Sequence, residues 1–117
     1  MLYEEFQRAV MFFEAKDYAE AARILAPIAT EEPSSRAVAE LLGRAYFHSA
    51  QLGPAERAFL RLIELDPGSA WAYEALARTL ERRSRPGEAA RYRNIARAMG
   101  AEPSPEIEVS VTAGNLA

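Results

Sequence analysis

Few side chains in this 117-residue chain could do catalytic chemistry. It has one histidine, His48, and no cysteine, which excludes thiol catalysis, disulfides and cysteine-bound zinc. A Ser-His-Asp triad would have to use His48, yet no serine lies in a nucleophile-elbow sequence. No carboxylates have the spacing of an EF-hand or an H-E-x-x-H motif, and the six glycines form no phosphate-binding loop. We therefore expect a protein that is not an enzyme and that needs no metal or cofactor.

The charge of the chain is unevenly placed. The net charge is −3, which argues against a dedicated nucleic-acid binder. Residues 1–32 hold seven acidic and three basic side chains, a net of −4, whereas residues 78–98 hold seven arginines and two glutamates, a net of +5. Ends of opposite charge can attract an acidic partner or a head-to-tail copy. A solvated, arginine-rich helix face explains the same pattern.

No apolar segment is long enough to cross a membrane. The longest apolar run near the N-terminus is 9–13, far below the roughly 20 residues of a membrane-spanning helix and unlike a signal peptide. We expect a cytoplasmic protein that does not associate with membranes.

The residues repeat with a period of 34. At this offset Ala9, Gly43 and Ala77 coincide, as do Ala21, Ala55 and Ala89. The third member of some sets differs in type, for example Phe12, Tyr46 and Leu80. Three units follow, 2–35, 36–69 and 70–103, and a fixed period of this length is typical of stacked helical repeats.

Each unit has helical spacing that is broken once. Ser35 can cap a helix over 36–49 and Ser69 the next one, while Asp17, with Glu20 three residues on, resembles a capping box. Pro54 and Pro86 are expected at the first position of a second helix. Pro27 lies inside such a helix and is expected to kink it, since it donates no hydrogen bond to the carbonyl of Arg23. The sequence therefore predicts an all-α protein of three helical hairpins.

Small and large residues alternate in the middle unit in a way that predicts close helix packing. Gly43 would let the first helix of the hairpin approach the second, where Ala55 is equally small, and Tyr46 and Phe59 would fill the space around this contact. Burying each ring contributes about 1.5 to 3 kcal/mol.

The last predicted helix, 86–99, has no further helix after it to cover its outer face. Arg93 and several alanines are expected on that face, where they would make it less prone to aggregate.

The middle unit resembles the tetratricopeptide repeat. Leu42-Gly43, Tyr46, Ala55, Phe59 and Pro67 fall in that family's register, with Ala39 where the family often has tryptophan. The resemblance covers residues 2–101, and it is weaker at Glu5 and Arg8 in the first unit and at Arg93 and Ala101 in the third. It implies a domain over 1–101 that forms a right-handed superhelix of six antiparallel helices. The first helix of each pair would line a concave groove, in a family that mostly binds other proteins.

The same resemblance assigns residues to the groove. The aromatic and apolar members have the composition of a protein-binding surface, with arginines and a glutamate nearby. Aromatic residues at helical spacing also pack in cores, and that alternative stays open for each. The groove candidates are Tyr3, Phe6, Val10, Phe13, Leu41, Arg44, Phe47, His48, Trp71, Glu74 and Arg78.

One known ligand class of the family is disfavoured. Members that bind the C-terminal carboxylates of large chaperones use lysine, arginine and asparagine at groove positions that here hold Phe6, Val10, Leu41, Trp71 and Ala75. None of these side chains binds a carboxylate through a charge or an amide.

The last residues differ from the rest. After two prolines, Ile107, Val109 and Val111 alternate with polar residues, as in a β-strand. A lone strand has no partner, so the tail 102–117 is expected either to be disordered or to bind in a groove of this chain or of a neighbour.

Three functions are compatible with these observations. The first is a non-enzymatic adaptor that binds a peptide or helix of an unidentified protein in its groove. The second is a unit that self-associates through its end helix or its tail. The third, RNA binding by a helical repeat, is weaker because the groove is mixed in charge.

Overall fold

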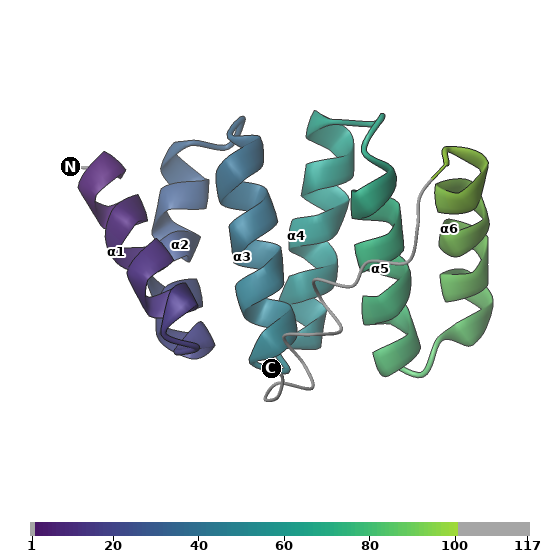
Figure 1. Ribbon diagram of the computed structural model, residues 1–117, viewed down its shortest axis with the longest axis horizontal. Coiled ribbons are helices and arrows are strands. Elements are labelled where there is room, and N and C mark those ends of the chain that lie inside the picture. The colour runs from purple at the N-terminus through teal and green to yellow at the C-terminus, as the bar shows by residue number, and fades with distance from the viewer. Residues whose placement is uncertain (1, 101–117) are drawn as a thin grey trace.

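The computed structural model describes residues 2–100, and these form six α-helices with no strand among them. Met1 and residues 101–117 lie outside the described part of the chain, and with them the predicted tail and the last three residues of the third unit. The helices are α1 (Leu2–Glu14), α2 (Tyr18–Glu31), α3 (Arg36–His48), α4 (Leu52–Leu65), α5 (Ala70–Arg82) and α6 (Pro86–Ala98). Each helix packs against the next in sequence (Figure 1). The prediction of an all-α superhelix of three hairpins is confirmed.

Three of the helices begin at side-chain caps that the sequence predicted. Asp17 accepts a hydrogen bond from the Glu20 amide at 3.3 Å, and Ser35 and Ser69 each accept one from the amide three residues on at 3.2 Å. These bonds satisfy amides that have no partner within the helix. The Glu20 carboxylate bonds to Arg23 and does not close the capping box.

The predicted proline positions are only partly right. Pro86 is the first residue of α6, as expected. Pro54 lies two residues inside α4, because that helix already begins at Leu52. Pro27 is exposed within α2, which continues past it to Glu31.

All three hairpins turn in the same way between their two helices. Lys16, Ala50 and Ser84, each 34 residues apart, have φ values of 66°, 62° and 63°. The following amide donates to the carbonyl five residues back, as in Gln51 to Tyr46 at 2.8 Å. This is a Schellman arrangement, which usually has glycine at the left-handed position. None of the three residues is glycine, so residue type alone does not predict these turns.

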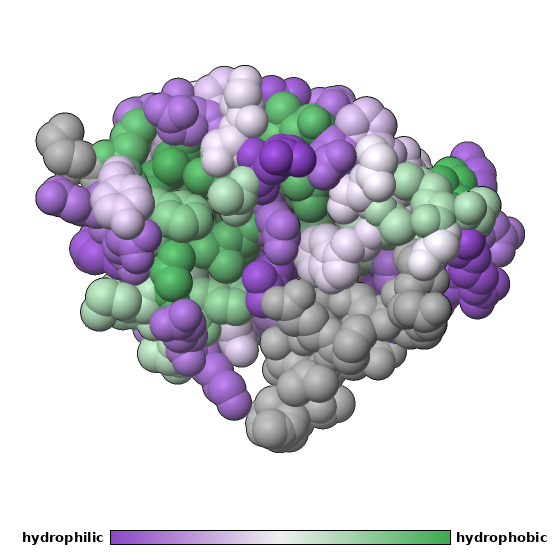
Figure 2. Space-filling view, turned by 45° about the horizontal axis from the view of Figure 1, so that its top comes forward, coloured by the Kyte–Doolittle hydropathy of each residue, from purple (hydrophilic) through white to green (hydrophobic). Residues whose placement is uncertain are grey.

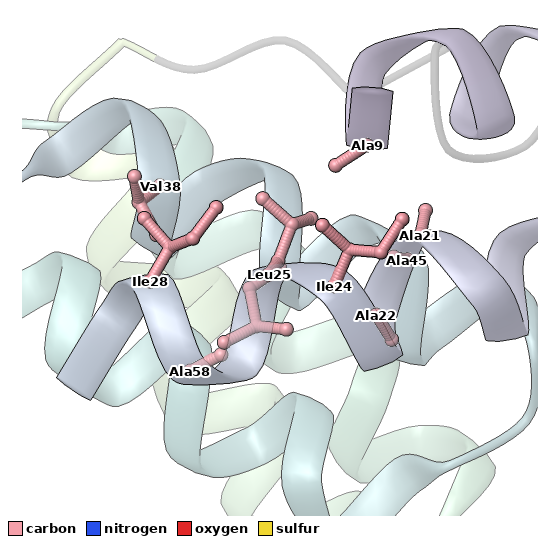
Figure 3. Packing of buried hydrophobic residues seen from close by; sticks show 10 residues of the cluster. Ala9, Ala21, Ala22, Ile24, Leu25, Ile28, Val38, Ala45 and Ala58 are labelled. Atoms are coloured by element: carbon pink, nitrogen blue, oxygen red, sulfur yellow. The ribbon is translucent and has the colours of Figure 1, made fainter. Parts of the chain in front are cut away.

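The core begins between the first two hairpins and continues along the stack. Ala9 of α1, Leu25 of α2 and Ala45 of α3 are fully buried in one cluster (Figure 3). A second cluster runs from α3 to α6 around Phe59, which is also fully buried. The predicted close approach lies here, because a Cβ atom on Gly43 would be 2.5 Å from a ring carbon of Phe59.

This contact gives a stability prediction. Gly43→Ala should lower the free energy of unfolding by about 1 to 3 kcal/mol, since the added methyl group overlaps the Phe59 ring in a packed core. Phe59→Leu in the same background should recover part of this loss, because it recreates the Ala9 and Leu25 combination of the first hairpin. Urea unfolding of the single and double variants measures both effects.

The matched control is Gly87→Ala, since no atom lies within 4 Å of a Cβ atom at Gly87 in α6. It should leave stability unchanged or slightly raised. Equal losses for the two alanine variants would show that the Phe59 contact is not the cause.

Candidate functional site

The N-terminal half of the predicted groove is apolar. Tyr3 is 72% exposed on α1, whereas Phe6, Val10 and Phe13 are half-buried on the same helix. Leu41 of α3 is half-buried and packs, like Phe6 and Phe13, against the first core cluster. Figure 2 shows hydrophobic residues gathered at the left, over α1 and α2, beside a hydrophilic band in the middle of the view.

A guanidinium group lies at the edge of this apolar region. Arg44 of α3 is placed over the Phe13 ring, with its central carbon 4.8 Å from the ring centroid, and lies 3.8 Å from the Glu40 carboxylate. Its side chain is only 17% exposed. A cation over an aromatic face in such a position is attracted by the ring electrons, so Phe13 holds Arg44 in place as well as filling space.

His48 is part of an aromatic cluster. Its ring centroid is 4.8 Å from that of Tyr18, 5.5 Å from Phe47 and 6.0 Å from Phe13. Neither ring nitrogen has a hydrogen-bond partner among residues 2–100. Burial, together with the positive charges of Arg44 and Arg82, lowers the pKa of His48 to about 4, so the imidazole is neutral at pH 7.

Phe47 belongs mainly to the core. Its side chain is 2% exposed, and Arg82 of α5 covers the ring with its guanidinium carbon 5.0 Å from the centroid. Arg82 also donates a hydrogen bond to the Phe47 carbonyl at 3.4 Å. A partner in the groove would therefore meet Arg82 rather than the Phe47 ring.

Glu74 is buried between two arginines in the C-terminal half. It is 5% exposed, and its carboxylate lies 3.2 Å from Arg78 one helical turn on and 3.4 Å from Arg93 of α6. Arg93 also bonds to Glu81, which lowers the pKa of that carboxyl and raises the pKa of Arg93. A buried carboxylate needs such partners because removal from water disfavours its charge.

The position of Arg93 corrects the interpretation from the sequence. Instead of lying on the open outer face of α6, its side chain is only 20% exposed and turns toward α5. It occupies the place that Leu25 and Phe59 have in the first two hairpins. The sequence does contain a sign of this inward position. Arg93 stands at a repeat position that is otherwise apolar, and the preceding helix carries two glutamates that can pair with it.

Trp71 is half-buried at the start of α5. Its ring meets the edge of Phe59, with centroids 5.9 Å apart at an angle of 75°. Edge-to-face pairs of this kind stabilise packing, so one side of Trp71 belongs to the core. It is the chain's only tryptophan.

Two features are absent from residues 2–100. Within 2–100, no group of three or more histidine, aspartate or glutamate side chains is close enough to hold a metal ion. No helix in this range is long and apolar enough to cross a membrane. The ionisable side chains of the groove are instead engaged in ion pairs and ring contacts.

Comparison with known families identifies the repeat. The family model described as "Tetratricopeptide repeat" matches residues 12–79, which is more than half of the chain. The chain belongs to the tetratricopeptide repeat family. This match includes the whole middle hairpin, with Gly43 and Phe59, and confirms the resemblance inferred from the sequence.

Several solved structures of MamA have a similar fold. "MamA MSR-1 C2" has a TM-score of 0.81 at 19% identity over 85% of this chain, and a structure of MamA AMB-1 has 0.80 at 20% over 84%. MamA residues 41 to the end from Desulfovibrio magneticus RS-1 has 0.79 at 20% over 85%. The chain spans only 57%, 58% and 56% of these three structures respectively. A sequence search among curated proteins gave no match. Identities this low show the shared fold alone.

The environment of His48 predicts a pH dependence of stability. Because its folded-state pKa is about 4 against 6.5 for the free side chain, the unfolded chain binds a proton first as the pH falls. The neutral His48 therefore contributes to the free energy of unfolding in full above pH 6.5, and this contribution is lost as the pH falls from 6.5 to 4. The loss is on the order of 2 kcal/mol once solvent screening of the partly exposed ring is discounted. His48→Gln cannot take up this proton and should lack that part of the pH dependence. Urea unfolding at several pH values, with wild type and variant compared, measures it.

Identical slopes for the two proteins between pH 6.5 and 4 would contradict the assignment. Carboxylates that titrate in the same range are common to both proteins, so they cancel in the comparison.

Proposed function

We propose that this tetratricopeptide repeat is a non-enzymatic adaptor whose concave groove binds a segment of another protein. Members of the family act as protein-interaction modules, and the groove of this chain favours a particular composition of the bound segment. The proposal rests on one observation, the division of the groove into an apolar half and a half rich in guanidinium groups. The ligand would be an extended or helical segment that carries apolar residues next to acidic ones.

The apolar half offers surface that a partner can bury. Tyr3 is mostly exposed, and Phe6, Val10 and Leu41 each keep part of their surface accessible. Burial of such side chains contributes roughly 25 cal/mol per Å² of apolar area before the costs of association. Tyrosine is also among the residues enriched at the centre of protein interfaces.

The charged half supplies orientation and specificity. Arg44 and Arg78 are equivalent residues one repeat apart, and both are held by a glutamate one turn earlier on the same helix. Their geometry is fixed before a ligand arrives, so less side-chain entropy is lost on binding. Arg82 is exposed beside them, and its guanidinium can form paired hydrogen bonds with a carboxylate.

Charge reversal in the groove tests this function. Peptides of random sequence displayed on phage would be selected on the full chain, and their dissociation constants measured by fluorescence polarisation. Arg82→Glu should weaken the selected acidic peptides at least tenfold, because it replaces an attraction by a repulsion.

Arg57→Glu is the matched control, since Arg57 is exposed on α4 beside the depression formed by Ala26, Ala58 and Tyr46. It should leave the affinity within twofold. Equal effects of the two reversals, or failure to select any peptide, would refute groove binding.

A second function, self-association, is favoured by the two ends of the stack. Tyr3 and Met11 of α1 are 72% and 67% exposed, and Ile95 and Met99 at the other end are each 38% exposed. The first end is acidic in sequence and the last is rich in arginine. A head-to-tail contact between two copies could bury these apolar side chains and bring the acidic end of one copy next to the arginine-rich end of the other.

This alternative predicts association that depends on concentration and salt. The mass measured by light scattering should rise with concentration at low ionic strength and fall when salt is added. Arg91→Glu combined with Arg97→Glu, both exposed on α6, should abolish the rise. A monomer at every concentration and salt level would exclude self-association through the end helices.

A further inference from the structure

The two halves of the proposed groove lie in a fixed order along the stack, with the arginines nearer to α6 and the apolar residues nearer to α1. Starting from the α6 end of the stack, a ligand would first meet Arg78 and Arg82 of α5 and then Arg44 of α3. Only beyond Arg44 does it reach the apolar region around Leu41 and α1. An extended ligand that begins near α6 should therefore carry its acidic residues first and its apolar residues later.

The sequence that follows α6 has this order. Gly100 has φ +89° and its amide donates to the Arg97 carbonyl at 2.9 Å, so the chain leaves the helix there. Glu102 comes first, Glu106 and Glu108 follow on either side of Ile107, and Val109 and Val111 come last. We propose that residues 106–112 bind in the concave groove of their own chain and thereby compete with its external partners. This inference depends on the groove being a binding site, as argued under the proposed function.

The length of the segment matches the groove. At 3.3 to 3.6 Å per extended residue, Glu106 can lie up to about 22 Å and Val111 up to about 40 Å from Gly100. The longest dimension of the molecule is 39 Å, and packed helices are about 8 to 10 Å apart. Glu106 can thus reach the arginines of α5, and Val111 can reach the far half of the groove.

The alternation of residues fits a surface with an apolar floor and charged edges. In an extended segment Ile107, Val109 and Val111 lie on one side, while Glu106 and Glu108 lie on the other. The apolar side can cover groove surface while the carboxylates approach guanidinium groups.

The opposite face of the stack is a poorer site for this segment. It has a depression of about 280 Å³ between α2, α3 and α4, where alanines, Leu42 and Tyr46 form the apolar lining and Arg57 and Arg61 the charged one. Arg61 at its edge already donates to the Pro33 carbonyl at 2.9 Å and to Glu64 at 2.9 Å. A carboxylate that approached Arg61 would have to replace these hydrogen bonds, whereas among residues 2–100 Arg82 in the groove donates one longer hydrogen bond, to the Phe47 carbonyl at 3.4 Å.

A peptide added to the full chain tests the proposal. The probe is a labelled peptide with the sequence of residues 102–117, and the readouts are fluorescence polarisation and the emission of Trp71. Wild type should bind it weakly because the groove is already occupied. The variant Ile107→Asp, Val109→Asp, Val111→Asp should bind it at least tenfold more tightly, since its own segment no longer competes.

Two controls locate the effect. Leu116→Asp, outside the proposed segment, should leave the affinity for the peptide as in wild type. Arg82→Glu added to the triple variant should remove the gain, which places the peptide in the groove. Equal affinity of wild type and triple variant would overturn the proposal.

The remaining outcomes separate this inference from the proposed function. If phage-selected peptides bind and depend on Arg82 but the triple variant changes nothing, the tail is not the occupant and the adaptor function stands. If no peptide of either kind binds, both fail. If wild type is a dimer by light scattering and the triple variant a monomer, the segment occupies a second copy, and binding within one chain is wrong.

Discussion

The structure depends on how closely the two helices of each hairpin approach one another. At the contact point the first helix has a small residue and the second a larger one, as in Gly43 and Phe59. The rigid ring of Phe59 leaves no room for a Cβ atom, whereas the smaller, flexible Leu25 allows alanine at Ala9, and both of these are fully buried. The size of one residue thus limits the other, and this pair sets the geometry on which the next hairpin stacks.

In the third hairpin, the position of Leu25 and Phe59 holds a charged residue in place of an apolar one. Arg93 stands where the first two have apolar side chains, and no further helix within the described residues covers α6. Its guanidinium reaches Glu74 and Glu81 on α5. The exchange links the packing to the groove, since Arg93 of α6 and Arg78 of α5 both pair with the buried Glu74 carboxylate.

The sequence predicted the features that depend on local chemistry. The caps at Asp17, Ser35 and Ser69, and the start of α6 at Pro86, follow from how these residues interact with nearby backbone groups. The left-handed turn residue Ala50 and its equivalents could not be predicted, because their conformation is imposed by packing rather than favoured by residue type.

Groove assignment from sequence was limited for a similar reason. A position on the first helix of a repeat fixes the Cα atom but not how much of the side chain stays accessible. Tyr3 is open whereas Phe47, at a position also expected to line the groove, is 2% exposed beneath Arg82. What covers Phe47 is the following hairpin, since Arg82 of α5 lies over its ring and donates to its carbonyl. The chemistry offered to a ligand is therefore set by which rings are covered by guanidinium groups, and that depends on contacts between residues of neighbouring repeats.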